Sequence, residues 1–229
     1  IITTTQAQAQ GQFFRPTGDQ VSGIATARSQ YLRSPCPALN ALANHGFIPR
    51  DGRNLTPQML RSAIMQVYNV DMSTAMLQTA TLPFRLTLAD LSQHNFIEHD
   101  SSLVHADASY RQDPAQVDGA LTNDLLGRAT NGQLGVREVG LALRDRLAWC
   151  KQKPTGCDFR SNQRSIIFRE AATLLQVFGG KRGATISAPH AYSFMVLEQI
   201  PADWQRPATS VTLMELEMIS FQIQMAAGA

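Results

Sequence analysis

The chain has 229 residues, 44% of them apolar, which is enough to fill the core of one large domain or two small ones and argues against a disordered chain. Lys and Arg total 20 against 18 Asp and Glu, so the formal charge is only +2, and a nucleic-acid binder would lack the charge that neutralises phosphates. The longest apolar runs, at residues 191–197 and 213–225, are short or interrupted by Glu and Gln, which excludes a membrane span.

Apolar residues at helical spacing predict a succession of helices along the chain. Residues 1–12 carry little structure-forming pattern and are expected to be flexible. Helices are then expected at 38–43, 57–67, 73–82, 86–96, 113–126, 135–150, 161–178, 188–197 and 211–225. Strand signals are confined to residues 184–186. Because there is no repeat, linker or break in composition, the sequence predicts one all-α, mostly helical domain over residues 1–229.

Three cysteines leave one thiol without an intramolecular partner. Cys150 and Cys157 flank the turn-like segment 151–156, which could bring their sulfurs together in a disulfide. Cys36 then remains as a buried thiol, an intermolecular pairing site or a chemical group. The chain begins with a polar stretch typical of a processed mature protein, so secretion is expected. Asn54 opens one glycosylation acceptor, weakened by the proline three residues later.

Cys36 stands between two prolines at the predicted start of a helix. Pro37 suits the first helical position, which places Cys36 at the N-cap. The N–H groups of Ala38, Leu39 and Asn40 would point toward its sulfur, and with the helix dipole they would make the thiol ionise easily. Such a thiolate is a nucleophile, a redox sensor or a metal ligand, and the stiff flanking backbone suits a ligand best. The alternative is a buried cysteine with chance prolines.

The sequence Ser-Pro-Cys-Pro-Ala-Leu-Asn-Ala-Leu-Ala-Asn-His-Gly-Phe-Ile-Pro-Arg-Asp-Gly over residues 34–52 resembles the proximal motif of the heme-thiolate peroxidases, the family of chloroperoxidase and the fungal unspecific peroxygenases. The resemblance continues in Glu-His-Asp-Ser-Ser-Leu at 98–103, and more loosely at 168–170 and 192–204. It implies a helical fold that encloses heme b, with Cys36 as the axial ligand of the iron.

Polar residues of the Cys36 helix are given structural roles. Asn40, Asn44 and His45 are expected to fix the loop that follows this helix rather than to touch the heme.

The resemblance also implies a glutamate that moves the peroxide proton. Short members of the family orient it with the histidine of Glu-His-Asp, and longer members use an arginine two turns earlier. Gln163 stands seven residues before Glu170, so the chain resembles the short form and His99 is the expected partner. Glu170 is chosen because apolar residues surround it in the predicted helix, and burial would raise its pKa toward that of a useful base.

Two other interpretations of the acidic residues stay open. Glu170 could instead be a surface glutamate paired with Arg164 or Arg169. Glu198 is the rival acid, although its segment resembles a structural helix end of the family.

By the same resemblance, the Glu98 carboxylate, the His99 carbonyl and the Ser102 hydroxyl bind Mg2+ or Mn2+ together with a heme propionate. His105 stands where the family commonly has an arginine, which puts the arginine's salt bridge in doubt. His94, His99 and His105 could suggest zinc, but their spacing does not place them on one helix face.

The substrate pocket is predicted from the helical neighbours of Glu170. Ile166, Thr173 and Leu174 share its face, Ile97 precedes His99 by two residues, and Phe84 is a candidate gate. An aliphatic lining would favour fatty acids, alkanes and terpenes. The alternative is that Ile166 and Leu174 belong to the ordinary core.

The sequence therefore predicts a secreted, H2O2-dependent heme-thiolate peroxygenase that inserts oxygen into C–H bonds, double bonds and aromatic rings, with peroxidase side activity. Its expected partners are H2O2 and small apolar organic substrates, and not nucleic acid. The alternatives are a chloroperoxidase-type haloperoxidase and an inactive secreted binding protein that kept the fold.

Overall fold

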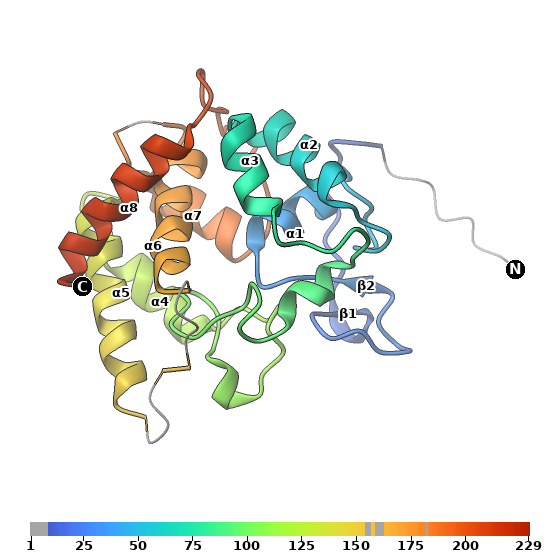
Figure 1. Ribbon diagram of the computed structural model, residues 1–229, viewed down its shortest axis with the longest axis horizontal. Coiled ribbons are helices and arrows are strands. Elements are labelled where there is room, and N and C mark those ends of the chain that lie inside the picture. Colours follow the sequence, from blue (N-terminus) through green and yellow to red (C-terminus); the bar gives the residue numbers. More distant parts are fainter. Residues whose placement is uncertain (1–8, 154–156, 159–162, 182) are drawn as a thin grey trace, which may run out of the picture.

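The structure is a computed structural model that describes residues 9–153, 157–158, 163–181 and 183–229. In this part the chain forms eight α-helices joined by long loops (Figure 1), so the all-α prediction is confirmed. The helices are α1 (Pro37–Asn44), α2 (Pro57–Tyr68), α3 (Met72–Thr79), α4 (Gly119–Gly127), α5 (Val136–Lys151), α6 (Gln163–Thr173), α7 (Ala188–Met195) and α8 (Leu213–Ala227).

Short elements complete the described chain. Three 3-10 turns are η1 (Gly18–Gln20), η2 (Leu88–Ser92) and η3 (Ala108–Tyr110), and η4 (Leu174–Phe178) is a π-helical turn. Strand β1 (Val21–Ser22) pairs in parallel with β2 (Tyr31–Leu32), and β3 (Gln133–Leu134) pairs antiparallel with β4 (Ile186–Ser187). The strand signal at 184–186 thus overlaps β4 at Ile186, whereas the other three strands, of two residues each, were not predicted.

Helix starts follow the local capping residues. Thr56 Oγ1 accepts a hydrogen bond from the Met59 N–H at the start of α2, and Pro57 occupies its first position, as predicted. Asp71 caps α3 in the same way, and Thr212 with Glu215 forms a capping box at α8. These caps use only neighbouring residues, which is why the sequence predicts them.

One predicted helix is wrong, and another begins later than expected. The helix expected at 86–96 is reduced to η2, because the backbone is already extended at Gln93 (φ −64°, ψ 119°) and is left-handed at Asn95 (φ 65°). The helix expected from Asp113 begins only at Gly119. The Asp113 carboxylate instead accepts hydrogen bonds from the Ser22 hydroxyl (2.5 Å) and the Gly23 N–H, which holds this segment against the N-terminal part of the chain.

The predicted helix at 161–178 is α6 continued by η4; residues 161 and 162 lie outside the described part. It stops at Gly179 as predicted. A Cβ at Gly179 would lie 1.9 Å from the Thr185 carbonyl oxygen, so only glycine allows this close approach of the two segments.

One hydrophobic core contains buried residues of all eight helices, and within it α8 packs against α5 and α6 (Figure 1). An aromatic cluster links these parts: the Phe178 ring stacks on Phe194 at 4.4 Å between centroids, and Tyr68 and Trp204 meet them edge-on. Among the described residues, no helix combines the length and apolar character needed to cross a membrane.

Residues 1–12, which are expected to be flexible, are only partly included in the described chain. Residues 1–8 lie outside the described part. In residues 9–12 the Gly11 N–H donates to the His45 carbonyl, and the Arg50 guanidinium donates to the Ala9 and Gln12 carbonyls; the flexibility of this stretch stays a prediction.

Candidate active site

Cys36 occupies the N-cap of α1, as predicted, with an extended backbone and Pro37 at the first helical position. The Cys36 N–H donates to the Ser34 hydroxyl at 3.2 Å, which fixes the turn before the helix. It is the one free cysteine of the chain, because Cys150 and Cys157 form a disulfide as the sequence suggested. The Cys36 residue is partly exposed.

The expectation that this thiol ionises easily is wrong for the environment that the protein supplies. Burial raises the pKa of Cys36 to about 11. The N–H groups of Leu39 and Ala38 favour the thiolate, as the sequence suggested, but the Glu170 carboxylate opposes them. Desolvation therefore outweighs the helix N-terminus at this position.

Asn40 holds the loop before Cys36, not the loop after α1 that the sequence suggested. Its Oδ1 accepts hydrogen bonds from the Ser34 N–H and hydroxyl, and its Nδ2 donates to the Ser34 carbonyl and to Glu198 Oε1 at 2.6 Å. Glu198 Oε2 accepts a hydrogen bond from Arg15 Nε at 3.1 Å. Glu198 is thus a buried carboxylate that accepts two hydrogen bonds, one on each oxygen, and supports the Cys36 turn.

Asn44 and His45 form hydrogen bonds with residues that are far apart in the sequence. Asn44 Oδ1 accepts from the buried Arg33 guanidinium, and Asn44 Nδ2 donates to the Glu198 carbonyl. His45 Nε2 accepts from the Ile200 N–H, so Nδ1 carries the proton that it donates to the Gly11 carbonyl. Both ring nitrogens of His45 are engaged, which agrees with a structural role.

His99 and Glu170 form the predicted pair. His99 is buried, and its Nε2 lies 3.1 Å from Glu170 Oε2. His99 Nδ1 lies 2.8 Å from the Asp100 carbonyl oxygen, which can only accept. Both ring nitrogens therefore donate, and His99 is an imidazolium facing a carboxylate.

The electrostatics agree with this assignment. Burial by itself lowers the pKa of His99, but the charge and hydrogen bond of Glu170, together with the Asp100 carbonyl, raise it to about 9. His99 is therefore protonated at neutral pH.

The expected burial of Glu170 is wrong. Its side chain is 55% exposed, because the buried face of α6 consists of Ile167, Phe168, Ala171 and Ala172 and Glu170 projects from another side. Arg169 does not neutralise it, since its Nε pairs with Glu217 at 2.7 Å. Glu170 is thus a solvent-exposed carboxylate that accepts a hydrogen bond from the buried His99.

Two of the residues predicted to bind a cation, Glu98 and Ser102, form hydrogen bonds with other residues of the chain. Glu98 Oε2 lies 2.6 Å from His94 Nδ1, and burial raises the pKa of Glu98. Ser102 Oγ accepts hydrogen bonds from the Val104 and His105 N–H groups. The donors are hard oxygens of the kind that Mg2+ prefers, but Glu98 already has a partner.

The three histidines considered for zinc have separate partners. His94 bonds Glu98 and Asp158, His99 bonds Glu170, and His105 Nδ1 bonds the Gln116 carbonyl. Among the described residues, the clustered metal-ligating side chains are Asp100, Asp107 and Cys150, and the Cys150 sulfur is taken by the disulfide.

An arginine supplies charge near His105 from another element. Arg146 on α5 donates to the Ser102 carbonyl and to Asp107, 39 residues away in sequence. Nothing local signals this contact.

The residues predicted to line a substrate pocket lie at different depths. Ile97 and Ile166 are half-buried, and the Thr173 hydroxyl donates to the Arg169 carbonyl. Leu174 is 2% exposed and belongs to the core, whereas Phe84 is 80% exposed on the surface. Their roles toward a substrate stay predictions.

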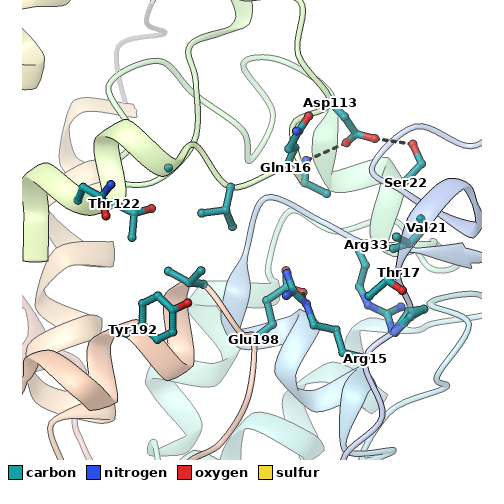
Figure 2. A pocket seen from close by; sticks show the side chains of 17 residues that line it. Arg15, Thr17, Val21, Ser22, Arg33, Asp113, Gln116, Thr122, Tyr192 and Glu198 are labelled. Atoms are coloured by element: carbon teal, nitrogen blue, oxygen red, sulfur yellow. Dashed lines mark hydrogen bonds and ion pairs between the residues drawn. The ribbon is translucent and has the colours of Figure 1, made fainter.

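A separate cavity of about 610 Å3 lies beside the Cys36 turn. Figure 2 shows Arg15 and Glu198 on one wall, Asp113 and Ser22 on another, and Tyr192 at the far end. Cys36, His99 and Glu170 do not line it. Its link to the site is the hydrogen bond from Asn40 to Glu198, which sequence reasoning missed because the two residues are 158 positions apart.

The fold and the site together define a mostly helical protein with a free cysteine at a helix N-terminus and a glutamate–histidine pair within electrostatic range of it. Residues 23–209 match the family described as "Peroxidase, family 2". The chain belongs to this family, and the resemblance seen in the sequence is confirmed.

Curated relatives agree over shorter stretches. The chain is 34% identical over 104 residues to a chloroperoxidase from Leptoxyphium fumago (40% of this chain, 27% of that protein). It is 39% identical over 62 residues to the dothistromin biosynthesis peroxidase dotB from Dothistroma septosporum (27% and 14%), and 30% identical over 104 residues to an aromatic peroxygenase from Cyclocybe aegerita (34% and 28%). The matched part thus spans less than a third of each relative.

Proposed function

We propose that this protein is a secreted heme-thiolate peroxygenase that uses H2O2 to insert oxygen into small apolar organic molecules, with peroxidase side activity. One observation carries the proposal. The Glu170 carboxylate, held 3.1 Å from the buried His99, adds to the raised pKa of Cys36, so the acid–base pair lies within electrostatic range of the free thiol.

The chemistry of Cys36 suits the iron of heme b. Cys36 is a soft donor, partly exposed on a stiff turn, and the N–H groups of Leu39 and Ala38 favour its thiolate. A metal ion on the sulfur would offset the desolvation that otherwise keeps the thiol protonated. When bound, a thiolate-ligated heme supplies O–O cleavage and the oxidant.

Glu170 is placed to handle the peroxide proton. Its exposed carboxylate can accept a proton from one peroxide oxygen and return it to the other, which is general acid–base catalysis by a single group. The His99 imidazolium orients this carboxylate through the 3.1 Å contact of its Nε2 with Oε2. Because His99 is buried and tied to the Asp100 carbonyl, the pair stays in place while the proton moves.

Mg2+ or Mn2+ is proposed at Glu98, the His99 carbonyl and Ser102. The hard oxygen donors support this, and the hydrogen bond from His94 to Glu98 would have to open or be shared. The Cys150–Cys157 disulfide supports a secreted protein, since disulfides persist in oxidising compartments.

The substrate would be selected by apolar contact with Ile97, Ile166 and Thr173, with Leu174 packed behind them and Phe84 as an outer gate. The chloroperoxidase relative makes halide oxidation a second candidate activity. The two activities share the peroxide step and differ in which molecule receives the oxygen.

The decisive experiment loads the purified chain with hemin and supplies 18O-labelled H2O2 with a fatty acid, an aromatic substrate or chloride. We expect a Soret maximum of the thiolate type in the reduced CO complex and 18O in the organic product. Halogenated product alone would favour the haloperoxidase. A chain that binds no heme would leave the inactive binding protein as the answer.

A further inference from the structure

The outer face of α8 carries a row of exposed apolar side chains. Met214, Met218, Phe221 and Met225 are 80%, 55%, 62% and 63% exposed. The opposite face of the same helix is buried against α5 and α6 through residues such as Leu216, Ile219 and Ile223. In Figure 1, α8 runs along the edge of the molecule, so nothing in the described chain covers this row. A contiguous apolar patch of this kind marks an interaction surface.

The spacing of the row fits a helix as partner. The intervals are four, three and four residues, which is the spacing of the a and d positions that one helix presents to another in a coiled coil. The outer row is therefore a second seam on a helix whose inner seam is already used.

Charge does not oppose a second copy at this seam. The two charged residues of α8 are both glutamates and both are paired within the chain. Glu217 pairs with Arg169 at 2.7 Å, and Glu215 with Lys181 at 2.7 Å. Two such helices can approach without leaving an unpaired charge between them.

The row is also self-complementary about its midpoint. If two α8 helices pack antiparallel around a two-fold axis between residues 219 and 220, Met214 meets Met225 of the other copy, and Met218 meets Phe221. In the same register Glu217 faces Gln222, whose amide can donate to the carboxylate. A two-fold interface requires this reciprocity: each contact between two residues occurs twice, once in each direction between the two copies.

We infer that the protein forms a symmetric homodimer through antiparallel packing of the α8 seam, defined as Met214, Met218, Phe221 and Met225. With side chains of roughly 150–250 Å2 each, the exposed fractions amount to roughly 500 Å2 per copy. The total of roughly 1,000 Å2 is at the lower limit of specific interfaces. We therefore expect a reversible dimer with a Kd on the order of micromolar.

The first test measures the mass of the full chain by analytical ultracentrifugation from about 1 to 200 μM. A concentration-dependent dimer is expected. Phe221→Glu and Met218→Glu should each raise the Kd more than about tenfold. The matched control is Phe84→Glu, which places the same charge on another exposed aromatic position and should leave the dimer intact. Circular dichroism checks that each variant is folded.

The second test fixes the register. Met214→Lys and Met225→Glu should each weaken the dimer, and the double variant should regain affinity, because the antiparallel register places each new lysine opposite a new glutamate. In a parallel pair the double variant would bring like charges together and weaken the dimer further.

Three results would overturn the inference. The wild-type chain could stay monomeric at about 200 μM. Phe221→Glu could leave the Kd of the dimer unchanged, or the double variant could have a higher Kd than both single variants. Capture of lipid vesicles by a monomeric wild-type chain, abolished by Phe221→Glu, would likewise assign the seam to a membrane surface instead.

Discussion

At the scale of single residues, Cys36 shows two local forces in opposition. The helix N-terminus favours the thiolate, yet burial raises its pKa to about 11. At neutral pH the raised pKa keeps the thiol in its protonated form, and a positively charged ligand on the sulfur would offset the desolvation. This combination protects a free cysteine from oxidation and suits a residue whose role is to bind a metal.

Cys36→Ser should abolish tight heme binding, because a hydroxyl cannot supply the thiolate ligand. Hemin titration followed by the Soret band measures this. The Ser34 and Asn40 contacts do not involve the sulfur, so the variant should fold as the wild type does. Retention of a thiolate-type spectrum in this variant would contradict the assignment.

Glu170→Gln should slow the reaction with H2O2 by about 10²–10⁴, since the amide cannot take a proton. Stopped-flow absorption measures the rate, and the heme spectrum should stay of the thiolate type. Glu198→Gln is the matched control: it should lower stability by loosening Asn40 and Arg15, with a smaller effect on the peroxide step. The reverse ranking would make Glu198 the base.

The His99–Glu170 pair should make stability depend on pH. The folded pKa of His99, about 9, lies above its ordinary value of 6.5, so the folded chain binds the proton more tightly. The stabilisation is fully present below pH 6.5 and is lost as the pH rises toward 9. Urea unfolding of the metal-free chain between these values should show a falling stability.

His99→Gln and Glu170→Gln should both flatten this slope. Measurements between pH 6.5 and about 7.5 keep the Cys36 thiol out of the comparison, because its pKa in the unfolded chain is about 8.5 and its ionisation begins roughly one pH unit below that value. A wild-type stability that does not change over this range would contradict the raised pKa of His99.

At the scale of elements, the contact of α5 with α8 depends on one small residue. A Cβ at Gly140 would lie 2.6 Å from the Ala226 Cβ and 3.0 Å from the Ile223 carbonyl oxygen. The two helices are therefore in backbone contact at this point. The same contact fixes how α8 presents its outer row.

Gly140→Ala should destabilise the protein by about 1–3 kcal/mol, because the added methyl group forces the helices apart. Gly127→Ala in α4 is the matched control, since a Cβ there has nothing within 4 Å, and it should be neutral or stabilising. Thermal unfolding compares the two. Equal Tm values would show that the close approach of α5 and α8 is not required.

Local rules also explain where element prediction succeeded and failed. Thr56 with Pro57 and Thr212 with Glu215 act within four residues, and the corresponding helices begin as expected. The helix expected from Asp113 begins only at Gly119, because the Asp113 carboxylate accepts a hydrogen bond from Ser22, about 90 residues away. No window of local sequence contains that partner.

At the scale of the whole molecule, the Cys150–Cys157 disulfide joins the end of α5 to the segment that leads to α6. The double variant Cys150→Ser/Cys157→Ser should lose about 2–3 kcal/mol of unfolding free energy, as expected for a short closed loop. Urea unfolding with and without reductant measures it. If the reduced wild type is as stable as the oxidised one, the bridge contributes nothing to the fold.

The sequence by itself determined the all-α class, the N-cap position of Cys36 and the pairing of His99 with Glu170. It did so because helical periodicity and caps are local, and because the motif at 34–52 places this chain among the heme-thiolate peroxidases. Only the tertiary structure decided that Glu170 is exposed, that Cys36 holds its proton and that Asn40 reaches Glu198. Exposure, desolvation and long-range hydrogen bonds depend on which distant segments pack together, and no local pattern encodes those neighbours.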